Sequence, residues 1–130
     1  MKLSIISPIA AALVLTGCAT DRVAPRDRGE ARLAAMLAGR VAGEPRSCIS
    51  AFDANRMQVI DQTAIVYDAG KTIWVSRPSD PKSLNSDDIV VIKRTGSQLC
   101  KQDVIRTVDR VNHFTTGVVF LGDFVPYEER

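Results

Sequence analysis

The stretch Met57–Ser76 reads MQVIDQTAIVYDAGKTIWVS, and its pattern decides the fold class. Three short runs rich in apolar and β-branched residues, at 57–60, 63–67 and 72–76, are separated by polar or turn-forming residues. Such runs are typical of antiparallel strands. Between the last two, Asp68-Ala69-Gly70-Lys71 supplies a glycine able to take the positive φ that a tight hairpin needs. The stretch therefore predicts a strand meander with a hairpin at Gly70.

Three more runs of the same kind follow along the chain. We expect strands near Ile89–Lys93, Val104–Val108 and Val118–Leu121. Between the two groups, Arg77–Asp88 holds two prolines together with Ser, Asp and Asn. Proline cannot donate to a strand ladder, and these polar side chains bond to their own backbone. This segment is therefore predicted to be a long polar loop.

An amphipathic helix is expected before the strands. Asp27 followed three residues later by Glu30 resembles a capping box. Apolar side chains then recur at helical spacing, at Leu33, Met36, Leu37 and Val41. Gly43 and Pro45 are typical of a helix end, so we predict a helix over Arg28–Ala42 that packs on its own sheet. A partner-binding or membrane-lying helix is the alternative.

The first 18 residues have the features of a lipoprotein signal peptide. Lys2 supplies a positive charge, and the almost wholly apolar run Leu3–Leu15 is 13 residues long. That is too short for a bilayer, which takes about 20 residues, but it suits a signal segment. The run ends in Leu15-Thr16-Gly17-Cys18, which resembles the bacterial lipobox, whose cysteine thiol accepts a diacylglycerol. An ordinary secretory signal with a chance cysteine is the alternative.

The sequence thus predicts three parts. These are a signal peptide over 1–17, a lipidated cysteine with a flexible tether over 18–28, and one small β-rich domain over 29–130. Two or more acyl chains, such as palmitate, anchor a protein stably at a membrane. By resemblance to Gram-negative lipoproteins, Ala19 in place of Asp implies transport to the outer membrane, with the domain facing the periplasm.

The composition gives no sign of a nucleic-acid partner. Lys and Arg total 17 against 15 Asp and Glu, and loss of Lys2 with the signal leaves 16 against 15, a net charge near +1. Nucleic-acid and anionic-surface binding usually need a larger basic excess. The hydrophobic fraction of 45% is typical of a globular domain rather than a disordered chain.

Two cysteines remain once Cys18 is lipidated. Cys48 and Cys100 allow only one pairing, and the predicted compartment is oxidising, so we expect a disulfide between them. The alternative makes one of them a nucleophile, with His113 as base and Asn112 as the orienting group. No flanking residues support that alternative.

Other chemistry finds little support in the sequence. His113 is the only histidine, which disfavours a zinc site. The oxygen-bearing residues Asp80, Asn85, Asp87 and Asp88 lack the spacing of an EF-hand loop. Phosphate-loop and nucleophile-elbow motifs are missing, so we predict no catalytic residue, no metal ligand and no cofactor. Six aromatic side chains are assigned to the core: Tyr67, Trp74, Phe114, Phe120, Phe124 and Tyr127.

A set of short motifs spans Cys48 to Tyr127: Cys48-Ile49, Val59-Ile60-Asp61-Gln62-Thr63, Gly96-Ser97-Gln98-Leu99-Cys100 with Asp103-Val104-Ile105, and Leu121-Gly122-Asp123-Phe124-Val125-Pro126-Tyr127. Together they resemble an uncharacterised family of small proteobacterial exported proteins and lipoproteins. The resemblance implies a compact β domain and no particular activity. Relatives carry a further cysteine pair, near the segment 81–84 and near Val119, where this chain has none.

The expected fold is α+β, with one N-terminal helix on a small curled antiparallel sheet or barrel of five or six strands and one disulfide. The expected role is non-catalytic: an envelope lipoprotein that binds or supports another envelope protein, held at the membrane by its lipid. The alternative is a small envelope enzyme, or an inhibitor of one, that uses the segment 77–88 or the region around His113. An exposed apolar patch or an open sheet edge would favour the binding role.

Overall fold

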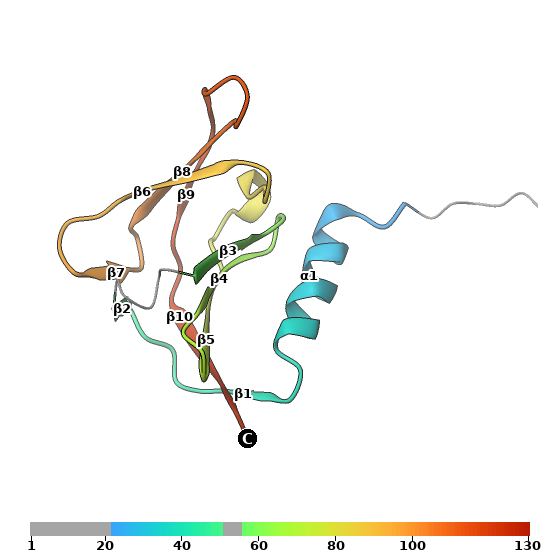
Figure 1. The fold of residues 1–130 in the computed structure, drawn as a ribbon, viewed down its shortest axis with the longest axis vertical. Helices are drawn as coiled ribbons and strands as arrows, with labels where there is room; N and C mark the ends of the chain where they lie inside the picture. Colours follow the sequence, from blue (N-terminus) through green and yellow to red (C-terminus); the bar gives the residue numbers. More distant parts are fainter. Residues whose placement is uncertain (1–21, 51–55) are drawn as a thin grey trace, which may run out of the picture.

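The computed structural model describes residues 22–50 and 56–130 of the 130-residue chain. The predicted signal peptide, Cys18 and the first residues of the predicted tether lie outside this part. The described chain forms one α-helix and several antiparallel sheets, which confirms the α+β prediction. Figure 1 shows the helix, α1 (Pro25–Met36), standing beside a central sheet, with the smaller sheets gathered away from the helix.

The central sheet has five strands in the order β1-β10-β5-β4-β3. Their bounds are β1 (Arg40–Ala42), β10 (Phe124–Glu129), β5 (Thr72–Ser76), β4 (Ala64–Asp68) and β3 (Met57–Ile60). The hairpin between β4 and β5 is confirmed: Gly70 has a φ of +85°, and its N–H donates to Asp68 Oδ1 at 2.8 Å. The meander 57–76 therefore forms three adjacent strands of the central sheet, as its pattern predicts.

Strand β4 is buried on both faces, because the central sheet is covered on both sides. Ile65 and Tyr67 point into one core with Phe124, and the Tyr67 and Phe124 rings meet edge to face at 5.8 Å. Ala64 and Val66 point into the other core, where Leu33 of α1 covers them. A strand that is buried on both faces has a continuous run of apolar residues, because neither face needs polar side chains. The sequence of β4, AIVYD, shows this pattern.

Two smaller sheets complete the described chain. One pairs β2 (Cys48–Ser50) with β7 (Gln98–Cys100), and the other has the order β6-β8-β9, formed by β6 (Ile89–Lys93), β8 (Val104–Val108) and β9 (Thr115–Phe120). The prediction of one sheet or barrel with five or six strands was wrong in detail. The described residues contain ten strands in three sheets, whose pairing does not close a barrel.

The predicted disulfide is confirmed. Cys48 and Cys100 are directly opposite each other in the β2–β7 pair, with an S–S distance of 2.07 Å. Asp103 closes the turn after β7, because its carboxylate accepts the Cys100 N–H at 2.8 Å. The disulfide thus links two three-residue strands that have few ladder hydrogen bonds of their own.

The predicted bounds of the helix were wrong at both ends. Helix α1 begins at Pro25, where a proline at the first position loses nothing by lacking an N–H, so residues 25–28 are helical and not tether. Asp27 lies in the first turn of the helix, so it is not the N-cap that the predicted capping box requires. The N-cap is Ala24, which forms no side-chain hydrogen bond to the helix. The helix ends at Met36, and the glycine that turns the chain is Gly39, with a φ of +78°, instead of Gly43.

Strands β1, β2, β7 and β10 are absent from the sequence prediction. Residues 40–42, expected as the last turn of the helix, instead pair with the end of β10, and Arg40 binds Glu129 at 3.0 Å across this pair. Long-range pairing outweighs local helix propensity here, since β10 offers an unpaired edge. Val41, expected on the buried face of the helix, is 44% exposed.

The segment 77–88 is a loop, as predicted, but it is pinned to the core. It contains a short 3-10 helix, η2 (Pro81–Ser83), whose first turn is capped when Asp80 accepts the Lys82 N–H. Leu84 follows and is only 1% exposed, and its carbonyl accepts the Gln62 N–H at 3.0 Å. One buried leucine therefore anchors an otherwise polar segment.

Candidate functional site

The strongest candidate site is one face of the sheet β6-β8-β9. The ladder pairs Val91 with Arg106 and Arg106 with Val118, so these three residues form a row across the sheet on one side. The alternate residues, such as Ile105 and Val119, are buried against the core. We call the solvent side the outer face, formed by Ile89, Val91, Lys93, Val104, Arg106, Val108, Val118 and Phe120.

The outer face is apolar and open to solvent. Val91 is 46%, Val118 49% and Phe120 50% exposed, and Ile89 adds a fourth exposed large apolar side chain. A solvent-facing strand surface normally alternates polar side chains, whereas β6 reads IVVIK and β9 ends in VVF. Contiguous exposed apolar residues mark interaction surfaces more often than isolated ones do. The face therefore has the character of a docking surface.

Arg106 lies at the centre of this face. It is exposed, stands between Val91 and Val118 across the ladder, and forms no ion pair among the described residues. Lys93 is the other charged member of the face and is also basic. Arginine set among apolar side chains is a frequent anchor in protein interfaces, because its guanidinium forms paired hydrogen bonds with a carboxylate. The face is thus complementary to an apolar surface that carries an acidic residue.

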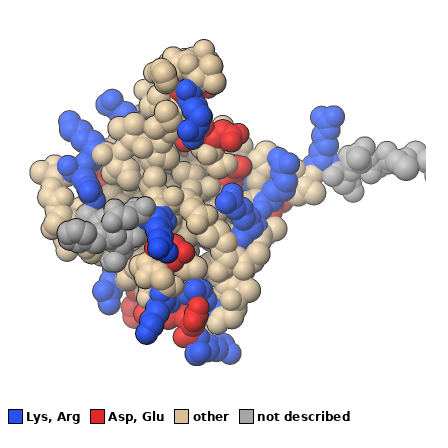
Figure 2. All heavy atoms as spheres, in the orientation of Figure 1, with Lys and Arg blue, Asp and Glu red and all other residues tan. Residues whose placement is uncertain are grey.

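The hairpin tip between β8 and β9 extends beyond the face and has a fixed shape. The Asp109 carboxylate accepts the N–H groups of Val111 and Asn112 at 2.9 and 2.6 Å, and these hydrogen bonds hold the pKa of Asp109 below its usual value. His113 takes a left-handed φ of +58°, and its N–H donates to the Asp109 carbonyl. Val111 is 81% exposed as a result. In Figure 2 the end of this tip is almost free of charged atoms.

The described residues do not assemble the Cys-His-Asn arrangement considered for His113. Both described cysteines form the disulfide, which removes the thiol from the Cys-His-Asn arrangement. His113 and Asn112 are exposed at the hairpin tip. Within residues 22–50 and 56–130, no group of three His, Cys, Asp or Glu side chains is placed to hold a metal ion.

Three of the four residues considered for calcium use their side-chain oxygens in other hydrogen bonds. Asp80 caps η2, and the Asn85 side chain accepts the Asp87 N–H at 3.0 Å. Asp88 accepts a hydrogen bond from the Thr116 hydroxyl. These three side-chain oxygens bind within the fold instead of converging on one point.

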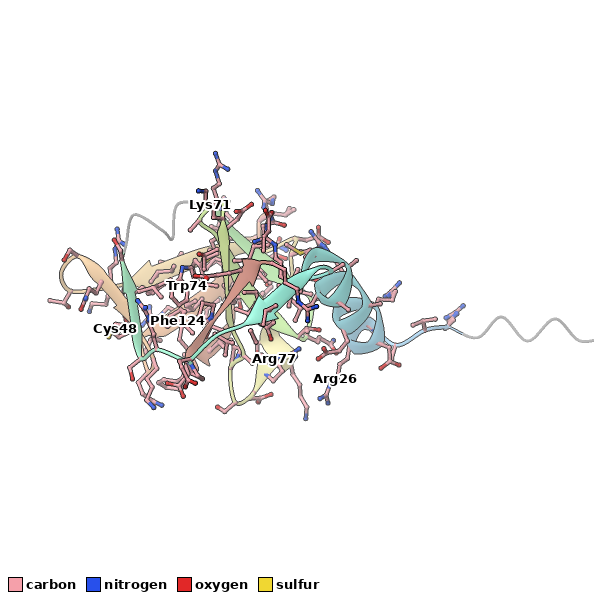
Figure 3. All side chains as sticks on the ribbon, turned by 90° about the horizontal axis from the view of Figure 1, so that it is seen from below. Arg26, Cys48, Lys71, Trp74, Arg77 and Phe124 are labelled. Atoms are coloured by element: carbon pink, nitrogen blue, oxygen red, sulfur yellow. A yellow bond between two sulfur atoms is a disulfide. The ribbon has the colours of Figure 1, made fainter. Side chains whose placement is uncertain are left out.

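A groove of about 550 Å³ lies between α1 and the segment 77–82. It is crossed by an ion pair in which Arg77 binds both oxygens of Glu30, at 2.7 and 3.0 Å. This hydrogen bonding holds the pKa of Glu30 below its usual value and raises the pKa of Arg77. Figure 3 shows Arg26 and Arg77 on the same side of the helix. The charges here largely neutralise each other, so the groove resembles a helix-to-loop contact more than a reactive site.

The assignment of all six aromatic side chains to the core was partly wrong. Tyr67, Trp74 and Phe124 are buried, and the Arg46 guanidinium lies 5.5 Å from the centre of the Trp74 ring. Phe120 and Phe114 are instead 50% and 56% exposed. The sequence does hold a signal for Phe120. It lies two residues after Val118 and so on the same side of the strand, whereas the buried Val119 between them faces the other side.

Comparison with known proteins adds no further constraint, because no protein-family model, no curated protein and no solved structure matches the chain. Among residues 22–50 and 56–130, no helix has the length and hydropathy needed to cross a membrane.

Proposed function

We propose that this protein is a non-catalytic binding component of a bacterial envelope, anchored by a lipid on Cys18 and using its outer face to dock on another envelope protein. The lipobox-like sequence Leu15–Cys18 and the preceding apolar segment support the anchor. Ala19 supports an outer-membrane location with the domain in the periplasm. An oxidising compartment also suits the disulfide Cys48–Cys100.

The single observation that carries the docking role is the exposed apolar outer face around Arg106. Burying Val91, Val118 and Phe120 against a partner would remove apolar surface from water, which is the main source of association free energy. Arg106 would then pair with a carboxylate of the partner and fix the orientation. The expected partner is an envelope protein with an apolar patch that contains Asp or Glu.

The tether suits a membrane-bound partner. Six residues, 19–24, separate Cys18 from the start of α1 at Pro25. Such a segment spans at most about 20 Å when fully extended. The domain would therefore stay close to the lipid surface, and its effective concentration toward partners in the same membrane would be high.

Site-specific photocrosslinking in cells tests the docking role. A photoreactive amino acid at position 118 should capture a defined envelope protein, whereas the same amino acid at position 71, on the β4–β5 hairpin, should not. Phe120→Asp and Arg106→Glu should each reduce capture at least about tenfold, the equivalent of one strong contact. Val41→Asp is the matched control, since Val41 is also exposed but lies on β1. Capture that is unchanged by Phe120→Asp would contradict the proposal.

The anchor is tested separately. Mass spectrometry of the mature N-terminal peptide should show acyl chains on Cys18, and Cys18→Ala should release the protein from membranes. Ala19→Asp should move the protein to the inner membrane. An unmodified Cys18 in a processed protein would contradict the lipid anchor while leaving the docking face to be judged by crosslinking.

A second function, as an enzyme or enzyme inhibitor, is favoured only by the groove between α1 and the segment 77–82. If that function were correct, Lys82→Glu at the groove rim should abolish it and Phe120→Asp should not. Undiminished binding of the envelope partner by Lys82→Glu, together with its loss in Phe120→Asp, would exclude the groove as the contact site.

A further inference from the structure

The edge of β6 is the longest regular strand edge without a partner in the described part of the chain. β6 pairs with β8 on one side, over five residues and without a register shift, and no described strand pairs with its other side. At the far side of the same sheet, β9 contains Gly117 and its ladder with β8 has an irregularity at Thr107/Val108. The outer strands of the central sheet, β1 and β3, are only three and four residues long.

The sequence of β6 does not protect this edge. Natural edge strands are usually blunted by proline, by bulges, or by a charge in the middle of the strand. β6 reads IVVIK, with four β-branched residues, no proline, and its only charge at the end, on Lys93. Such an edge offers unpaired backbone groups in an ideal geometry for another strand.

The charges beside β6 make it complementary to itself. Asp87 and Asp88 precede the strand, while Lys93 and Arg94 stand at its end. If two copies pair antiparallel about Val91, Asp88 of each copy lies opposite Arg94 of the other. Opposite charges facing each other across an antiparallel pair stabilise it. Parallel pairing in register would instead place like charges side by side.

The surface beside the start of β6 is hollowed. A groove of about 430 Å³ is lined there by Ile89 and Val90 together with Met57 and Val59 of β3. In Figure 2, Lys and Arg atoms gather at the left end of this region, and at its right Asp and Glu atoms lie beside a further basic side chain.

We propose that this protein forms a two-fold symmetric dimer in which β6 of one copy pairs antiparallel with β6 of the second, centred on Val91. The pairing joins two three-stranded sheets into one of six strands. It brings the outer faces of both copies together as one continuous surface, with an Arg106 from each copy. A two-fold interface of this kind closes on itself, so the assembly stops at two copies.

This inference stands apart from the proposed docking role, because self-pairing requires neither the lipid on Cys18 nor an envelope partner. If the protein dimerises but captures no envelope partner, only the self-pairing holds. If a monomer captures the partner, only the docking role holds. When both hold, the dimer presents two docking faces at once and raises avidity.

Disulfide trapping of the full-length, lipidated protein in detergent tests the pairing. Val91→Cys places two thiols opposite each other at the two-fold axis, with Cα atoms about 5 Å apart, and a mild oxidant such as copper phenanthroline should convert most of the protein to a covalent dimer. Val118→Cys is the matched control. It lies on the same face at similar exposure, but β9 stands two strands from the axis in each copy, so the thiols would be about 24 Å apart and should not link.

Charge reversal provides the second arm. In the Val91→Cys background, Arg94→Asp should lower the dimer association constant about tenfold, since it replaces two attractive contacts with two repulsive ones. Adding Asp88→Arg should restore trapping. Circular dichroism checks that each variant remains folded, because Asp88 also binds Thr116.

Three results would overturn the proposal. They are a Val91→Cys protein that stays monomeric after oxidation, equal trapping of the Val118→Cys control, and trapping of Val91→Cys to a different envelope protein, which would assign the edge to another chain. Failure of the double reversal to restore trapping would exclude the antiparallel register.

Discussion

Gly29 of α1 lies so close to Thr63, in the turn before β4, that any Cβ at position 29 would overlap the Thr63 hydroxyl. The Thr63 hydroxyl donates to the Asp61 carbonyl at 2.8 Å, and this carbonyl would be 2.5 Å from the same Cβ. Helix α1 therefore approaches the sheet through a residue without a side chain. Leu33, one turn later, fills the core beside it. This contact sets how deeply the helix sits on the central sheet.

Gly29→Ala should destabilise the protein despite the higher helix propensity of alanine. Overpacking of this kind lowers the free energy of unfolding by about 1–3 kcal/mol, and the higher helix propensity of alanine offsets about 1 kcal/mol of this loss. Urea unfolding followed by circular dichroism measures the change. Ala34→Leu, which adds side-chain atoms on an exposed position of the same helix, should stay within about 0.5 kcal/mol of the wild type. Equal stability of Gly29→Ala and wild type would mean that the helix can move outward freely.

Loss of the disulfide should be the largest single change in stability. Cys48 and Cys100 are 52 residues apart, and closure of such a loop contributes about 4 kcal/mol in the chain-entropy model. The double variant Cys48→Ser/Cys100→Ser should lose about that much in urea unfolding, and reductant should reproduce the effect in the wild type. A loss below about 1 kcal/mol would show that the reduced, unfolded chain is already compact near these residues.

Tyr67 should make the protein sensitive to alkali. Burial, together with the negative charge of Asp103, raises the pKa of Tyr67 well above its usual 10.0. The phenol stays neutral in the folded state and ionises near pH 10 in the unfolded state, so the unfolding free energy should fall as the pH rises above about 10. Tyr67→Phe should flatten this decline. Tyr127→Phe, at a partly exposed position, should not.

At neutral pH, Tyr67→Phe should raise the unfolding free energy by up to about 1 kcal/mol. The hydroxyl of Tyr67 is buried without a hydrogen-bond partner among the described residues, and an unsatisfied buried hydroxyl carries a desolvation cost. Thermal unfolding at pH 7 measures the change. A loss of 1 kcal/mol or more would reveal a partner for the hydroxyl, such as a buried water.

Acid should weaken the contact between α1 and the segment after β5. The pKa of Glu30 lies below its usual 4.5 because Arg77 hydrogen-bonds to the carboxylate. The ion pair therefore stabilises the fold above about pH 4.5, and this contribution is lost as the pH falls through the lowered pKa. Both side chains are about half exposed, so Glu30→Gln should cost only about 0.2–1 kcal/mol at pH 7. The variant should also lose less stability than the wild type between pH 5 and pH 3, a range about the pKa of a free carboxyl.

Four strands could be predicted to the residue from sequence alone: β3, β5, β6 and β8. Each combines β-branched residues with clear turn signals on at least one side, so local backbone preference and tertiary pairing agree. β10 escaped prediction because Pro126 interrupts it and two glutamates end it, both unfavourable in a central strand. β1, β2 and β7 are three residues long, and such segments become strands only when a partner is present.

The candidate site could be predicted only in part from the sequence. An exposed apolar patch is the feature that would favour a binding role, but the sequence does not show where such a patch lies. In IVVIK both alternating sets contain β-branched apolar residues, so only the terminal Lys93 indicates whether Val90 or Val91 faces the core. The phase is fixed by β8, where Ile105 and Thr107 are buried and Arg106 is not.

The sequence by itself determined the fold class, the β4–β5 hairpin and the disulfide, because these depend on local backbone preference and on having only one cysteine pair to join. Tertiary structure alone decided that Gly29 and Thr63 touch, that 40–42 is a strand, that Phe120 is exposed and that no described strand pairs with one side of β6. The physical reason is that exposure and pairing depend on which other elements cover a residue. That covering is set by contacts between residues far apart in the chain, which a local pattern does not encode.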